Sequence, residues 1–183
     1  KDVTKTASLA FKEAGDALLL VGETTGWLGQ SVYLRDICGR EEGAPPPIDL
    51  AAERRNGEAA RELIAEGLAR AVHDLSDGGL AVALAESCMA LGVGARIDAP
   101  QGAALHEWLF GEDQGRYLVA VAEGDAEAVL ARLREVGVPA TRIGVTGGET
   151  LALPGEAAIP VAALRKAHEE WLPAYMGGEI VNS

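Results

Sequence analysis

The chain has 183 residues, with 28 acidic and 16 basic side chains and a formal net charge of -12. This balance argues against nucleic acid as a partner, because affinity for a phosphate backbone comes from clustered cations. No signal peptide is evident, and every apolar run is too short to cross a membrane. Cys38 and Cys88 form no C-x-x-C pair, which favours a reducing compartment. We therefore expect a cytoplasmic protein with no membrane partner.

The residue pattern in the first half of the chain predicts a buried strand, an extended linker and two long helices. The continuous apolar run 17–21 is typical of a strand buried on both faces. In chain order we expect a strand (17–21), a short helix capped by Ser31 (31–37), a proline-rich linker (39–47), a helix (49–68), a strand (71–72) and an alanine-rich helix (79–91). Cys88 and Leu91 are expected on the buried face of that last helix.

The second half predicts strands alternating with helices. In chain order we expect a strand (93–97), a short helix (103–109), a polar loop (110–116), a strand (117–121), a helix (124–136), two strands (140–145 and 150–153) and a final helix from Pro160. The turn 146–149 is typical of a hairpin between the two strands. In the final helix Val161, Leu164, Trp171 and Leu172 form the expected packing face, and Pro173 is expected to bend or end it.

These elements predict an α+β fold, with a mixed sheet and helices in three layers. The order strand, helix, strand, strand in the second half is half of a ferredoxin-like unit, so the arrangement is expected to be partly ferredoxin-like. We expect residues 1–183 to form a single domain, with an initial strand and helix (1–38), a linker (39–47) and a main body (48–183). Because the chain begins at Lys1 without an initiator Met, we expect it to be a piece of a longer polypeptide.

The stretch from Ala71 to Glu86 is the candidate ligand-facing turn. A short strand leads into a loop with two carboxylates and a hydroxyl, and two glycines then open a helix. Asp74 and Asp77 supply the hard oxygens that magnesium prefers, and the helix offers unpaired N–H groups to an anion. An alternative is a tight strand-to-helix connection in which Ser76 or Asp77 caps the helix and the glycines serve only packing.

Other common sites are not predicted. The three histidines are far apart in sequence without the spacing of a zinc site, and neither standard nucleotide cradle is present. The apolar surroundings of Cys88 favour an inert core thiol. The loop at Glu112, Asp113 and Gln114 is a candidate for binding a metal or a substrate amide, and alternatively is a charged turn between two elements.

Six segments, taken together and in order, resemble phosphoribosylformylglycinamidine synthase subunit II of the small type. They are FKEAGD (11–16), VGET (21–24), LGQS (28–31), PPIDL (46–50), VHDLSDGGL (72–80) and FGEDQGR (110–116). The likeness covers nearly the whole chain and points to the last domain of that synthetase. This domain is the second copy of a C-terminal domain shared with aminoimidazole ribonucleotide synthetase.

The resemblance implies an ATP-dependent ligase of purine biosynthesis with ATP and Mg as cofactors. In that reaction the amide oxygen of formylglycinamide ribonucleotide is phosphorylated and then displaced by ammonia. The implied partners are the other domains of the full-length synthetase, a glutaminase subunit that releases the ammonia, and a small bridging subunit. The catalytic histidine and the ATP-binding residues of the family belong to earlier domains, so we expect no catalytic residue here and no activity of the isolated domain.

The resemblance also implies which residues form a pocket. Asp74 stands where the family has a magnesium carboxylate, and the loop 112–114 stands where the family holds substrate. We therefore expect metal binding by Asp74 and Asp77. Nucleotide or phosphate binding is expected from Ser76, Gly78, Gly79, Glu112, Asp113 and Gln114.

Two alternatives remain open at this point. One is a purely structural module that packs the synthetase domains together and contacts the glutaminase subunits. The other is the same domain type in a different ATP-dependent family, such as selenophosphate synthetases or thiamine-phosphate kinases. The segments FGEDQGR and PPPIDL favour the first family over this last alternative.

Overall fold

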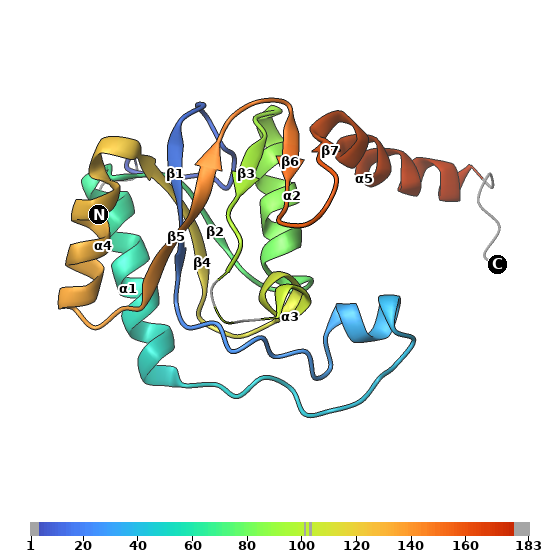
Figure 1. Cartoon of the computed structure of the whole chain (residues 1–183), viewed down its shortest axis with the longest axis horizontal. Helices are drawn as coiled ribbons and strands as arrows, with labels where there is room; N and C mark the ends of the chain where they lie inside the picture. The colour runs from blue at the N-terminus through green and yellow to red at the C-terminus, as the bar shows by residue number, and fades with distance from the viewer. Residues whose placement is uncertain (1–3, 101, 103, 178–183) are drawn as a thin grey trace.

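A computed structural model describes residues 4–100, 102 and 104–177 of the chain (Figure 1). The elements, in chain order, are β1 (Asp16–Val21), the π-helical segment η1 (Tyr33–Ile37), α1 (Leu50–Glu66), β2 (Ala69–Asp74), α2 (Gly79–Leu91), β3 (Ala95–Ile97), α3 (Leu105–Phe110), β4 (Tyr117–Ala122), the 3-10 helix η2 (Glu123–Asp125), α4 (Ala126–Glu135), β5 (Ala140–Thr146), β6 (Thr150–Ala152), β7 (Ile159–Pro160) and α5 (Val161–Met176).

The strands form one seven-stranded mixed sheet in the order β2-β4-β1-β5-β3-β6-β7. The first four strands of this order, with α1 after β1 and α4 before β5, make a complete ferredoxin-like unit: β1 and β2 flank β4, and β4 and β5 flank β1, all as antiparallel neighbours. The remaining strands extend the sheet at one edge. The expected α+β fold with a ferredoxin-like part is confirmed, and that part is larger than the half unit predicted from the sequence.

Helices lie on both sides of the sheet in Figure 1. An apolar cluster fills the space between the sheet and the helices on each side. Helices α1 and α4 bury Leu63 and Val129 against one face of β1, where Leu19 belongs to the same cluster. Helices α2 and α3 pack on the opposite face with Leu18 and Leu20. Every residue of β1 is buried, which confirms the prediction of a strand covered on both faces.

The predicted hairpin between β5 and β6 is wrong. Strand β3 lies between them, antiparallel to β5 and parallel to β6. The turn after β5 pairs with the segment before β3, because Gly147 N–H donates to Gly94 O and Gly94 N–H donates to Gly148 O. A Cβ on Gly94 would lie 2.3 Å from Thr150 O, so glycine permits this close approach.

The predicted packing of the last helix is wrong in its second half. Val161 is buried and Leu164 packs against the core, but Trp171 and Leu172 are more than half exposed. In Figure 1, α5 leaves the body of the molecule and ends away from it. The helix also continues past Pro173 to Met176. Leu91, at the end of α2, is likewise exposed and not buried as expected.

A long arm, residues 22–49, connects β1 to α1 and runs along one end of the sheet in Figure 1. Its second half, 39–47, contains no helix or strand and is fixed by hydrogen bonds back to the first half. Trp27 Nε1 donates to Ala44 O at 2.9 Å, and Gln30 Nε2 donates to Gly43 O at 3.0 Å. The helix predicted to start at Asp49 does so, and Asp49 caps α1 by accepting from Ala51 N and Ala52 N. The arm is therefore positioned close to the sheet end that carries the candidate site.

Candidate functional site: an acidic cleft at the end of β2

Antiparallel pairing of β2 with β4 brings the two candidate loops together. Asp74, the last residue of β2, is the register partner of Tyr117, the first residue of β4. The pairing extends by one further bond, in which Leu75 N donates to Arg116 O at 3.0 Å. The loop that follows β2 (75–78) and the loop that precedes β4 (111–116) therefore lie side by side, although about forty residues separate them in sequence.

These loops, the arm and α1 enclose a cleft of about 470 Å³ that we call the acidic cleft. Its lining residues are Gln30, Pro45, Pro46, Glu53, Asp74, Leu75, Ser76, Asp77, Glu112, Gln114, Gly115, Arg116 and Tyr117. Five of the predicted site residues are among them: Asp74, Ser76, Asp77, Glu112 and Gln114. Gly78, Gly79 and Asp113 are not.

The charge of the cleft is negative. Four carboxylates line it, and the single lining cation, Arg116, has a fully buried side chain. Burial raises the pKa of the Tyr117 phenol, and the negative charges of Glu53 and Asp74 raise it further. Each carboxylate within about 4 Å of a phosphate oxygen opposes its binding by about 1 kcal/mol in water and about 4 at an intermediate dielectric. These charges would therefore disfavour a phosphate that arrives without a cation.

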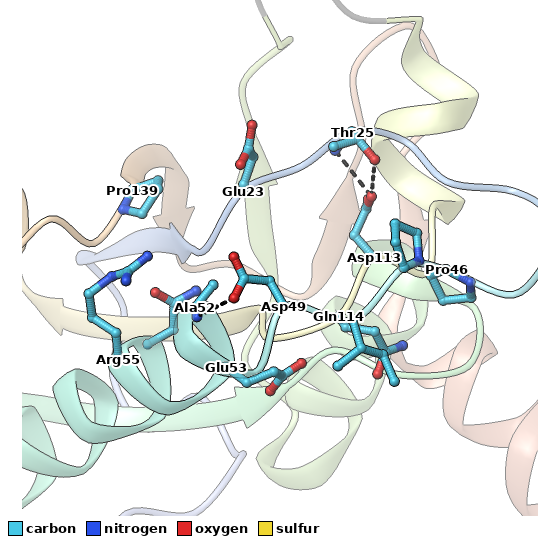
Figure 2. Close-up of a pocket in the computed structure, with 13 residues that line it drawn as sticks. Glu23, Thr25, Pro46, Asp49, Ala52, Glu53, Arg55, Asp113, Gln114 and Pro139 are labelled. Atoms are coloured by element: carbon cyan, nitrogen blue, oxygen red, sulfur yellow. Dashed lines mark hydrogen bonds between the residues drawn. The ribbon is translucent and has the colours of Figure 1, made fainter.

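Asp113 is turned away from the acidic cleft and holds the arm. Its buried carboxylate accepts hydrogen bonds from Gly26 N at 3.0 Å and from Thr25 N at 3.2 Å, as well as from the Thr25 hydroxyl. Arg116 Nη2 lies 3.8 Å from Asp113 Oδ2. Figure 2 shows Asp113 pointing toward Thr25. Each of these contacts lies within the protein and fixes the arm to the loop that precedes β4.

Glu112 joins the arm to the start of α2. Its Oε1 atom accepts from Gly78 N at 2.8 Å and from Val32 N at 2.9 Å. The N-cap of α2 is Gly78, in the left-handed region with φ of 78°, and no side chain caps it from its own position. The alternative in which Ser76 or Asp77 caps this helix is therefore wrong, because Glu112 reaches across from the neighbouring loop.

Gly79 has a packing role. Its φ is 62°, and a Cβ would lie 2.5 Å from Gly111 O and 2.9 Å from Leu109 O. The backbone that follows α3 thus passes directly over the first turn of α2. The two glycines bring the loops together, and the Gly78 N–H is already bonded within the protein.

The two metal candidates are placed differently from Glu112 and Asp113. Asp74 and Asp77 are both exposed, and the Asp74 side chain retains 77% of its accessible surface. Among residues 4–100, 102 and 104–177, no cluster of three or more Asp, Glu, His or Cys side chains has the geometry of a metal cage. Magnesium is usually held by one or two carboxylates together with phosphate oxygens of a substrate, so Asp74 and Asp77 fit a shared site and not an all-protein cage.

A second, smaller cleft of about 290 Å³ adjoins the acidic cleft (Figure 2). The two share Pro46, Glu53 and Gln114 as lining residues. Asp49 and Glu53 project from the start of α1, and Arg55 lies in its second turn. Gln114, which lines both clefts, is exposed and donates from Nε2 to Glu112 O at 3.2 Å.

Sequence reasoning missed four polar residues that line the acidic cleft: Gln30, Glu53, Arg116 and Tyr117. The signal for Tyr117 was its position at the start of a strand, but its proximity to Asp74 depends on the β2–β4 register. One expectation outside the cleft is confirmed, and one histidine contact is new. Cys88 is fully buried, which raises the pKa of its thiol to about 12. His73 Nε2 lies 2.6 Å from Glu86 Oε2, so this histidine is held by a side-chain hydrogen bond to α2.

No helix among the described residues is long and apolar enough to span a membrane.

The chain is similar to known proteins in both sequence and fold. Residues 13–153 match the family model of the AIR synthase related protein, C-terminal domain. The chain is 63% identical over 179 residues to phosphoribosylformylglycinamidine synthase subunit PurL of Rhodopseudomonas palustris strain HaA2, covering 97% of this chain and 24% of the relative. It thus spans about a quarter of the length of the curated relatives that it matches.

Among solved structures, PurL of Thermotoga maritima in complex with FGAR has the same fold. The TM-score is 0.74 at 21% identity, covering 89% of this chain and 30% of that chain. The Thermotoga protein has also been solved in complex with ATP and in the PurLQS assembly. The family model matches more than half of the sequence, and the chain therefore belongs to the family of AIR synthase related C-terminal domains.

Proposed function

We propose that the chain is one domain of an ATP-dependent ligase of the PurL type, which converts formylglycinamide ribonucleotide to formylglycinamidine ribonucleotide in purine biosynthesis. The observation that carries this proposal is the acidic cleft, where Asp74 and Asp77 are exposed beside a glycine-opened helix. The identity of 63% to a PurL subunit supports the assignment of the ligase. On this proposal the whole chain acts as a single domain in the cytoplasm.

The residues of the cleft divide into two roles. Asp74 and Asp77 would hold magnesium together with a phosphate of ATP, and Ser76 and Gln114 are placed to hydrogen-bond the same ligand. Bound magnesium would neutralise the carboxylates and the phosphate. Gly78, Gly79, Glu112 and Asp113 position the loops, because their polar groups are bonded within the protein or packed against backbone.

We expect no turnover by the domain alone. The described residues contain no nucleophile and base held together in the cleft, and the remaining cleft walls would come from other domains. The other domains of the synthetase, a glutaminase subunit and a small bridging subunit are the proposed partners. The PurLQS assembly of the Thermotoga protein, which shares the fold, makes partner subunits a reasonable expectation.

A second candidate is a purely structural module that packs the synthetase domains together. The observation favouring it is that Glu112 and Asp113 are both engaged in internal hydrogen bonds, and that Glu112 occupies the Gly78 N–H. On this alternative the acidic cleft would bind no nucleotide, and substitutions in the loop after β2 would leave ligand binding unchanged.

Hydrogen exchange of the full-length polypeptide distinguishes the two candidates. ATP with magnesium should slow exchange at residues 74–80, whereas ATP with a chelator should not. Residues 126–135 of α4, on the other side of the sheet, serve as the internal control. Unchanged exchange at 74–80 under saturating magnesium and ATP would favour the structural module.

The inactivity of the domain is tested separately. Phosphate release is measured with ATP, magnesium, formylglycinamide ribonucleotide and ammonia. The purified 183-residue chain should not exceed the blank, while the full-length polypeptide should turn over. Turnover by the isolated chain would contradict the division of the site between domains.

A further inference from the structure

The last helix carries apolar side chains along one face, interrupted in its middle by Arg165 and His168, and only the beginning of this face is covered. At 3.6 residues per turn, the side chains of this face lie within an arc of about 140°. The apolar side chains on it are Val161, Leu164, Trp171, Leu172, Tyr175 and Met176. The first two pack into the core, and the last four are between 44% and 76% exposed.

The exposed end has a defined shape. The rings of Trp171 and Tyr175 stack on one another with centroids 5.3 Å apart and planes 6° apart. Every residue from Lys166 to Pro173 is exposed, and Figure 1 shows this part of α5 extending beyond the sheet and α2. A short helix in water that is anchored only at its start is marginally stable, because helical stability in proteins comes mainly from packing an apolar face.

A cleft of about 500 Å³ opens where α5 leaves the body, between α5 and α2. Leu9 and Met89 supply apolar walls, and Arg165, His168 and Glu169 supply a polar edge. Arg165 is fixed there, since it donates to the Met89 carbonyl and lies near Glu169. Glu86 also lines this cleft, so it is mainly polar and borders the exposed apolar end of α5, and a polar border around an apolar patch is the usual organisation of a protein interface.

We infer that the exposed apolar face of α5, with the cleft at its root, is the docking surface for another domain of the same polypeptide. This inference rests on the proposal that the chain is one domain of a longer protein, and its curated relatives are about four times as long. A domain on the same chain has an effective concentration in the millimolar range, so it covers such a face before a separate molecule does. Each aromatic side chain can bury about 150–250 Å² in such a contact.

The inference predicts a local difference in hydrogen exchange. In the full-length polypeptide, amides at 168–176 should exchange at least tenfold more slowly than in the double variant Trp171→Lys, Leu172→Lys. The matched control is Val136→Lys, which also replaces a half-exposed apolar side chain but lies beyond α4 on the other side of the molecule. This control should leave exchange at 168–176 unchanged. A Trp171→Phe variant, which keeps an aromatic ring, should retain most of the protection.

Dilution separates the possible occupants. Protection that is unchanged over a tenfold dilution supports a domain on the same chain, whereas protection lost on dilution, as for a second copy or a separate subunit, overturns the inference. Rapid exchange at 168–176 in the unmodified full-length protein, or protection that survives the double substitution, also overturns it. Magnesium-dependent ATP binding by the same samples reports on the proposed function independently, because the acidic cleft lies at the opposite end of α2.

Discussion

The loops after β2 and before β4 lie side by side, contain acidic residues next to glycines, and use those residues differently. In the loop before β4, Asp113 is buried and Glu112 is half-buried, and both accept hydrogen bonds from backbone N–H groups. At the end of β2 and in the loop that follows it, Asp74 and Asp77 are exposed. A carboxylate next to a glycine thus has two outcomes: where backbone donors surround it, it stabilises the fold, and where it remains in solvent it is available to a cation.

The largest expected effect is the loss of stability when Asp113, the buried carboxylate, is replaced. Asp113→Asn removes the negative charge beside the buried Arg116 and weakens the bonds to the arm, so the free energy of unfolding should fall by about 3–5 kcal/mol. Urea unfolding of the 183-residue chain measures this. The control is Asp77→Asn, an exposed change that should stay within about 0.5 kcal/mol. Equal losses in the two variants would contradict the assignment of Asp113 to stability.

The next effect concerns the glycine that lets the loops meet. Gly79→Ala places a Cβ against the carbonyls of Gly111 and Leu109, and should cost about 1–3 kcal/mol beyond the backbone strain. Gly67→Ala is the matched control, since Gly67 has a similar positive φ of 76° and no atom within 4 Å of the added Cβ. The difference between the free energies of unfolding of the two variants, measured by heat or urea, gives the cost of the contact between the added Cβ and the two carbonyls. If the two changes cost the same, the contact between the loops is looser than described.

A smaller effect is expected at Glu112. Glu112→Gln keeps an oxygen that can accept from Gly78 N and Val32 N but removes the charge near the start of α2, which should cost about 0.5–1 kcal/mol. Glu112→Ala removes the acceptor as well and should cost about 1–3 kcal/mol, because the Gly78 N–H is buried. Stability measurements on the pair separate charge from hydrogen bonding. A fully stable Glu112→Ala would show that this bond contributes nothing.

The smallest effect is a pKa shift that reports on the charge of the acidic cleft. The pKa of Tyr117 is raised by burial and by the charges of Glu53 and Asp74, so the folded protein should lose stability as the pH rises above about 10, the ordinary value of the phenol. Asp74→Asn should lower the pKa of Tyr117 toward that value. Phenolate absorbance during titration checks this, with Asp125→Asn, remote on η2, as the control. An unchanged titration would place Asp74 farther from Tyr117 than the register implies.

Much of the fold was predictable because local signals were strong. The run 17–21 is apolar at every position, Asp49 is a good cap for α1, and Gly137 ends the turn after α4 in the left-handed region with φ of 71°. The hairpin at 146–149 was wrong because its turn residues are also compatible with a crossover around β3, and only the pairing of Gly94 with that turn distinguishes the two. Periodicity likewise could not show that α5 extends past its support.

The sequence predicted which loops lie together better than it predicted the contacts of their side chains. The loop after β2 and the loop before β4 were identified, and the β2–β4 register brings them together. The sequence does not reveal which carboxylates find backbone donors, because those donors belong to the arm and to α2, far away along the chain. Glu53 and Tyr117 were missed for the same reason: each reaches the cleft through tertiary packing.

The measurement that tests this account most directly is calorimetric titration of the full-length polypeptide with ATP, with any other nucleotide site blocked by mutation. We expect binding only with magnesium, because a helix N-terminus contributes about 0.3–2 kcal/mol and does not offset the repulsion from the carboxylates. Asp74→Asn should weaken that binding at least tenfold while leaving the free energy of unfolding unchanged. Metal-independent binding, or unaltered affinity in Asp74→Asn, would contradict the assignment and leave the loop after β2 as a structural turn.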